Sequence, residues 1–117
     1  MGWTEITAGT PELTLNKNGL LEWNTALQIL LSDPSWVNLM WDPDERHLGV
    51  RGVCFMQGLP VYSEKDKGEY KIDSSDLLNE AGISVNETLS AEPTKATEPI
   101  RTGEFAYFPI YHITLPE

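Results

Sequence analysis

The sequence predicts a mostly β fold with two short helices, built from two ββαββ units that share one core. Sliding the chain by 49 residues brings its turn residues and much of its apolar pattern into coincidence. Apolar and polar residues alternate on both sides of each coincident turn, which predicts strands. A polar capping residue and a short apolar run then follow each strand pair, which predicts a helix. A repeat of this length is typical of a supersecondary unit that needs its twin to bury its apolar face.

The two units are expected near residues 11–53 and 60–110, related by pseudo-twofold symmetry within a single domain, 1–117. The pairs that coincide under the shift are Pro11 and Pro60, Leu13 and Tyr62, Gly19 and Gly68, Leu21 and Tyr70, Trp23 and Ile72, and Asn24 and Asp73.

The first unit opens with a hairpin over residues 13–23, in which Gly19 allows the positive φ of a tight turn. Asn24 can accept a hydrogen bond from the exposed amides of a helix start. The helix is expected over residues 25–31, and because it is apolar on most sides we expect it to be largely buried.

A second hairpin is expected over residues 36–53, where Asp42 and Pro43 occupy the first two positions of a type I turn. Trp36 and Trp41 have opposite parity on the first strand, so they should face opposite sides of the sheet. One is expected in the core and the other at an interface, for which Trp41 is the candidate.

The second unit repeats this order, with a charged turn ending at Gly68 and Asp73 as the cap of a helix over residues 74–81. A strand is expected at Ile83–Val85, a mobile loop over 90–103 and closing strands within 105–115. The shared core is expected to join Leu13, Leu21, Trp23, Ile29 and Leu30 of the first unit to Tyr62, Tyr70, Ile72, Leu77 and Leu78 of the second.

This order of strand, glycine turn, strand, polar cap, short helix and hairpin, with Gly19 and Gly68 at the turns, resembles the AbrB/SpoVT-like swapped-hairpin module. The resemblance implies that two units interlock into one swapped-hairpin-like barrel, here in tandem within one chain. It also implies a DNA-binding transcription regulator as one possible function. The first half, from Leu15 through Trp41 to Arg46, is also similar to small uncharacterised bacterial proteins, and this implies no activity.

The residues that would contact DNA depart from that family's pattern. Its DNA-binding members carry an arginine after the turn glycine, where this chain has Leu20 and Glu69, and neither expected helix contains Lys or Arg. The formal net charge is −10, from 18 carboxylates against 8 Lys and Arg. Because affinity for phosphate backbones comes mainly from Lys and Arg, DNA is not expected as a partner.

The composition indicates a globular protein without a membrane partner, because no apolar run approaches the roughly 18 residues that a spanning helix needs. The lone Cys54 has apolar neighbours and excludes an internal disulfide, which favours a reducing cytoplasm. The first ten residues lack the pattern of a secretory signal, in agreement with a cytoplasmic location. Either a monomer or a homodimer is compatible with the sequence.

No catalytic residue, cofactor site or metal site is expected. His47 and His112 lie far apart in sequence, and with Cys54 they show no ligand spacing. The acidic turn 42–45 lacks the ligand pattern of a calcium loop. No nucleophile motif or phosphate-binding glycine loop is present, so the chain is not expected to be an enzyme.

The acidic surface leaves three functions open. The first is a non-catalytic interaction or regulatory module that binds a protein partner, for which a basic protein is a candidate. The second is a nucleic-acid mimic that inhibits a nuclease or a DNA-binding protein, which would need carboxylates in phosphate-like rows. The third is the AbrB-like regulator. Residues 64–104 hold ten of the 18 acids, and the candidate partner-binding residues are Glu64, Asp66, Glu69, Asp76, Glu80 and Trp41.

Overall fold

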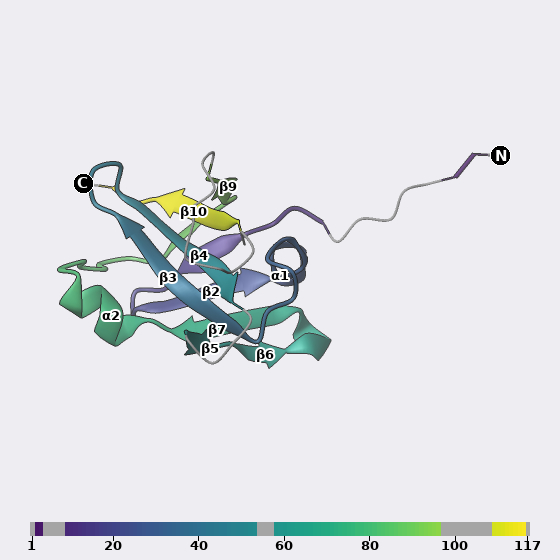
Figure 1. Cartoon of the computed structure of the whole chain (residues 1–117), viewed down its shortest axis with the longest axis horizontal. Coiled ribbons are helices and arrows are strands. Elements are labelled where there is room, and N and C mark those ends of the chain that lie inside the picture. The colour runs from purple at the N-terminus through teal and green to yellow at the C-terminus, as the bar shows by residue number, and fades with distance from the viewer. Residues whose placement is uncertain (1, 4–8, 54–57, 97–108, 117) are drawn as a thin grey trace.

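A computed structural model describes residues 2–3, 9–53, 58–96 and 109–116, and within them the predicted mostly β fold with two short helices is confirmed. The strands form two five-stranded sheets, seen as two layers in Figure 1. Sheet A contains β1 (Leu13–Leu15), β2 (Leu20–Asn24), β6 (Tyr62–Glu64), β7 (Glu69–Asp73) and β8 (Leu89–Ala91), in the order β6-β7-β2-β1-β8. Sheet B contains β3 (Trp36–Asp42), β4 (His47–Val53), β5 (Leu59–Pro60), β9 (Thr94–Lys95) and β10 (Ile110–Thr114), in the order β5-β3-β4-β10-β9.

The helical elements are short. They are α1 (Thr25–Leu30), α2 (Ser75–Glu80) and the 3-10 turn η1 (Lys65–Lys67). In the described part of the chain, no helix is long and apolar enough to cross a membrane.

One hydrophobic core fills the space between the two sheets. Sheet A contributes Leu13, Leu15, Leu21, Trp23, Tyr70 and Ile72, and sheet B contributes Val37, Leu48, Val50, Tyr111 and Ile113. Leu27 of α1 and Leu78 of α2 belong to the same cluster. Both halves of the chain therefore share one core.

The ladder between β2 and β7 obeys the 49-residue shift. Leu20 pairs with Asp73 at one end of the ladder, and Asn24 pairs with Glu69 at the other end. Under the 49-residue shift Leu20 corresponds to Glu69 and Asn24 corresponds to Asp73, so the first pair maps onto the second. Glu22 and Lys71 lie opposite each other at its centre. The two strand pairs thus meet as an antiparallel and locally symmetric arrangement in the middle of sheet A.

Each turn glycine lies against the start of the other unit's helix. A Cβ built on Gly19 would approach Ser75 Cβ to 2.8 Å, and one built on Gly68 would approach Thr25 Oγ1 to 3.0 Å. Both glycines have positive φ, 88° and 64°, which side-chain-bearing residues rarely adopt. Ser74, which is fully buried, donates its hydroxyl to the carbonyl of Gly19.

After the helices the two units differ in their strand pairing. In the first unit β3 and β4 form a long hairpin in sheet B, whereas β8 of the second unit pairs with β1 in sheet A. Residues 97–108 lie outside the described residues, and Cys54 does too. A pseudo-twofold relation over the whole units 11–53 and 60–110 therefore stays a prediction.

The placement of Tyr62 in the core was wrong, because the second hairpin pairs one residue out of step with the first. Leu13 pairs with Trp23, so the shift would pair Tyr62 with Ile72, but Tyr62 instead pairs with Lys71. Since a one-residue slip moves a strand's side chains to the other face, Tyr62 points outward and is 56% exposed.

Burial of both helices is also less complete than predicted. Ala26, Leu27 and Gln28 of α1 are buried, but Ile29 and Leu30 are exposed, as is Leu77 of α2. Each helix has only about two turns and lies with one side against the sheets, so the residues on its other side stay in water.

The helix starts follow the predicted chemistry with one adjustment. Asn24 Oδ1 accepts a hydrogen bond from the amide of Leu27 at 3.1 Å, as expected of a cap. In the second unit Ser74 occupies the cap position, and Asp73 precedes it while accepting from the amide of Ser75 at 3.4 Å.

Two predictions near the C-terminal end were wrong. Ile83–Val85 is not a strand, although Ile83 is buried in the core. Residues 90–96, expected at the start of a loop, include part of β8 and all of β9, because polar side chains suffice where edge strands pair by backbone hydrogen bonds.

Candidate functional site

A groove of about 560 Å³ lies on the outer face of sheet A. It is lined by residues of β1, β2, β6 and β7 and of the segments beside them. These are Glu12, Thr14, Glu22, Trp23, Asn24, Tyr62, Ser63, Glu64, Gly68, Glu69, Tyr70 and Lys71.

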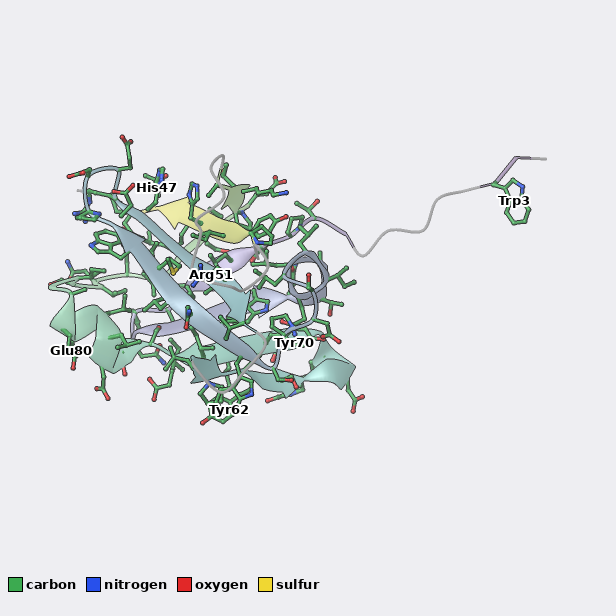
Figure 2. All side chains as sticks on the ribbon, in the orientation of Figure 1. Trp3, His47, Arg51, Tyr62, Tyr70 and Glu80 are labelled. Carbon is green, nitrogen blue, oxygen red and sulfur yellow. The ribbon has the colours of Figure 1, made fainter. Side chains whose placement is uncertain are left out.

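Strand register brings one row of side chains across the groove. Thr14 pairs with Glu22, Glu22 with Lys71, and Lys71 with Tyr62. Residues that pair directly across a ladder project to the same face, so all four point away from the core. Figure 2 shows Tyr62 projecting outward from β6.

A second row lies beside the first and is more acidic. Asn24 pairs with Glu69, and Glu69 pairs with Glu64. The amide of Glu12 donates to Asn24 Oδ1 at 3.2 Å, which holds Glu12 next to this row. Two like charges directly opposite each other, as Glu64 and Glu69 are, destabilise a strand pair unless a cation approaches them.

At the edge of the groove beside β8, hydroxyl groups hold the carboxylate of Glu12 in place. Ser90 of β8 donates to Glu12 Oε1 at 2.8 Å, and its Oγ lies 2.9 Å from Thr14 Oγ1. These contacts order one carboxylate of the groove, so less side-chain entropy is left to lose when a partner binds there.

The groove is strongly acidic. The described residues that line it include Glu12, Glu22, Glu64 and Glu69 and a single cationic side chain, Lys71. Among the described residues the single ion pair joins Lys67 Nζ to Glu64 Oε2 at 3.3 Å, with both side chains at least half exposed. Such a pair contributes little free energy and is easily exchanged for a partner's cation.

The predicted partner-binding residues lie in three places: in or beside the groove, on α2, and on β3 of sheet B. Glu64 and Glu69 line the groove, and Asp66 is exposed in η1 at its end. Asp76 and Glu80 are exposed on α2, at the opposite end of β7 from η1, and Figure 2 shows Glu80 well away from Tyr62.

Trp41 lies in neither acidic region. It pairs with Leu48 on the inner face of sheet B and packs partly buried against the core. The guanidinium of Arg46 lies 5.6 Å from the centroid of its ring.

Glu12, Glu22, Tyr62 and Lys71 are groove residues that sequence reasoning did not select. Glu22 could have been found from its parity, because it alternates with Leu21 and Trp23 and must face outward. Tyr62 could not, since its outward position depends on the register slip.

Two histidines that are distant in sequence meet on the outer face of sheet B. The rings of His47 and His112 stack with centroids 4.0 Å apart and 14° between planes. His112 pairs with Gly49, and this leaves room beside it for the ring of His47. Stacked rings do not aim their nitrogens at a common point, and among the described residues no group of three His, Cys, Asp or Glu side chains could hold a metal ion.

The histidine pair predicts a pH-dependent stability. Burial lowers the pKa of His112 below 6.5, the charge of His47 lowers this pKa further, and Asp42 opposes both effects. His112 Nδ1 is buried with no hydrogen-bond partner among the described residues. Between the lowered pKa and 6.5 the unfolded chain therefore binds more protons than the folded chain, so stability is full above pH 6.5 and falls as the pH is lowered.

This dependence can be measured by urea unfolding at pH 7.5, 6.5 and 5.5. The wild type should lose unfolding free energy on acidification, and His112→Gln should lose less. His47→Gln should also lose less, because it removes the second cause of the lowered pKa. An equal loss in wild type and His112→Gln would contradict the assignment.

Comparison of the chain with protein-family models, with curated proteins and with solved structures finds no match.

Proposed function

We propose that this protein is a non-catalytic interaction module whose acidic groove binds a basic segment of a protein partner in the cytoplasm. The observation that supports it most is the composition of the groove, where Glu12, Glu22, Glu64 and Glu69 face one lysine across an open sheet surface. Lys and Arg side chains of a partner would be attracted to this face, and the attraction would mainly speed association.

Tyr62 supports a protein partner in particular. Its ring is more than half exposed inside the groove, beside Lys71. Exposed tyrosine is enriched at protein interfaces, and its ring face can hold a guanidinium or ammonium group by cation–π attraction. A basic segment with arginine therefore fits both the charge and the aromatic surface.

The nucleic-acid mimic is less well supported. Along the outer face of β7 the order is Glu69, Lys71, Asp73, so a cation interrupts the carboxylates. Alternate residues of a strand lie about 6.6–6.8 Å apart, close to phosphate spacing, but the sign of the charge is wrong at the middle position. The AbrB-like DNA-binding regulator is opposed by the same groove, which would repel a duplex.

Two charge-reversal variants test the proposal. The groove variant combines Glu22→Lys with Glu69→Lys, and the control combines Asp76→Lys with Glu80→Lys on α2. Both make the same change in net charge. The probe is a fluorescent peptide of alternating arginine and alanine, followed by stopped-flow anisotropy at several salt concentrations.

We expect the groove variant to slow association roughly tenfold at low salt and to flatten its salt dependence, since steered association depends steeply on ionic strength. The control variant should stay within about twofold of wild type. Equal effects of the two variants would mean that net charge alone attracts the peptide, and the groove would lose its role. Saturable binding of a DNA duplex to the wild type would instead favour the regulator.

A further inference from the structure

A second cavity, of about 600 Å³, shares no lining residue with the acidic groove. It lies at the end of the molecule where the β3–β4 turn, the segment after α2 and the C-terminal residues meet, on the left of Figure 1. Its apolar wall includes Leu15, Trp41, Val85, Leu89 and Leu115, all of which belong to the core or pack against it. The volume of this cavity falls within the range of small-molecule sites.

Arg46 lines this cavity and is held in place from several sides. Its guanidinium lies 5.6 Å from the Trp41 ring centroid, and its Nη2 donates to the carbonyl of Pro116 at 3.0 Å. Its own carbonyl accepts from the amide of Leu115 at 2.8 Å. The side chain is therefore positioned before any ligand arrives.

The guanidinium has unused hydrogen-bonding capacity. Arg46 Nε is buried and has no hydrogen-bond partner among the described residues. No described carboxylate lies within 4.0 Å of Arg46, even though the chain carries 18 acids. A guanidinium carries five N–H donors, and a carboxylate would accept charge-assisted hydrogen bonds from its terminal N–H groups, which no described carboxylate occupies.

We propose that this cavity binds a small amphipathic carboxylic acid, with its apolar chain against Leu89 and Leu115 and its carboxylate on Arg46. A monoanion fits better than a phosphate dianion, because among the described residues that line the cavity Arg46 is the one cation and Glu87 is also present. The site is separate from the acidic groove and does not depend on the function proposed for it.

Isothermal titration calorimetry with decanoate and with decanol tests the proposal. The wild type should bind decanoate about 10- to 100-fold more tightly than decanol, as one charge-assisted hydrogen bond predicts. Arg46→Gln should remove most of that difference while binding decanol as before, which also shows that its cavity is intact. Lys67→Gln removes an exposed cation elsewhere and should bind both compounds like wild type.

A second variant tests the location. Leu89→Trp should fill the cavity and weaken both compounds at least tenfold. The proposal is overturned if decanoate does not bind the wild type at millimolar concentration, if decanol binds as tightly as decanoate, or if Leu89→Trp binds both unchanged. Should Arg46→Gln not fold, the preference of the wild type for decanoate over decanol decides the role of the carboxylate.

Discussion

Replacing Gly49 by alanine is expected to destabilise the protein by about 2–3 kcal/mol, a large effect for adding one methyl group. Gly49 lies in the middle of β4, where it pairs with His112 of β10. A Cβ built on it would come within 2.5 Å of the carbonyl oxygen of Tyr111 and within 2.9 Å of His112 Cβ. The nearest atom belongs to the backbone, so a rotamer change cannot relieve the clash.

The opposing effect is smaller. Alanine restricts the unfolded chain more than glycine does, which would stabilise the protein by about 0.4–1 kcal/mol at a tolerant position. The clash should exceed this gain, because β10 must shift away from β4 and the histidine stack depends on that pairing.

Urea unfolding followed by circular dichroism measures the change. Gly2→Ala is the matched control, since a Cβ at Gly2 would meet nothing within 4 Å. Unchanged stability of Gly49→Ala would mean that β4 and β10 are farther apart than described.

Local patterns in the sequence were sufficient to predict the hairpins. The alternation over residues 36–53 predicted the strand pair that appears as β3 and β4. The turn between them follows the expected aspartate chemistry, with Asp42 Oδ1 accepting from the amides of Asp44 and Glu45. These features depend on neighbouring residues, and for that reason the sequence reveals them.

Features that depend on register or on distant segments could not be predicted. The β6–β7 hairpin pairs one residue out of register with the β1–β2 hairpin, because the turns of the two hairpins differ in geometry. This difference in register places Tyr62 in the groove. The stacking of His47 on His112 depends on the pairing of β4 with β10, which are far apart in sequence. Of the candidate acids, Glu64 and Glu69 line the groove because they flank the turn of that second hairpin, whereas Asp76 and Glu80 lie on a helix beyond it.

A buried polar cluster around Gln28 was also missed, because the helix pattern was interpreted only by its apolar residues. Gln28 is 3% exposed and lies on the side of α1 that faces the core. Its Oε1 accepts from Trp23 Nε1 at 2.8 Å, and its Nε2 donates to Pro34 O at 2.9 Å and to Asp33 Oδ1 at 3.1 Å. It therefore joins β2 to the connection between α1 and β3.

Gln28→Leu should cost about 2–4 kcal/mol of unfolding free energy, although leucine has a similar size and suits a core. The substitution leaves the buried indole N–H of Trp23 without its acceptor, and an unsatisfied buried group costs about 1–3 kcal/mol. It also releases the connection in which Ser32 and Asp33 adopt positive φ of 73° and 50°, a conformation that needs support from its surroundings.

A double-mutant cycle separates these two contributions. In a Trp23→Phe background there is no indole N–H that could lose its acceptor. Gln28→Leu should therefore lower the free energy of unfolding by at least about 1 kcal/mol less than it does in wild type, which is the coupling expected of residues in one network. The cost that persists measures the support of the Ser32–Asp33 connection. If the cost of Gln28→Leu were the same in both backgrounds, the hydrogen bond to Trp23 would contribute nothing, and clamping of the connection would account for the burial of Gln28.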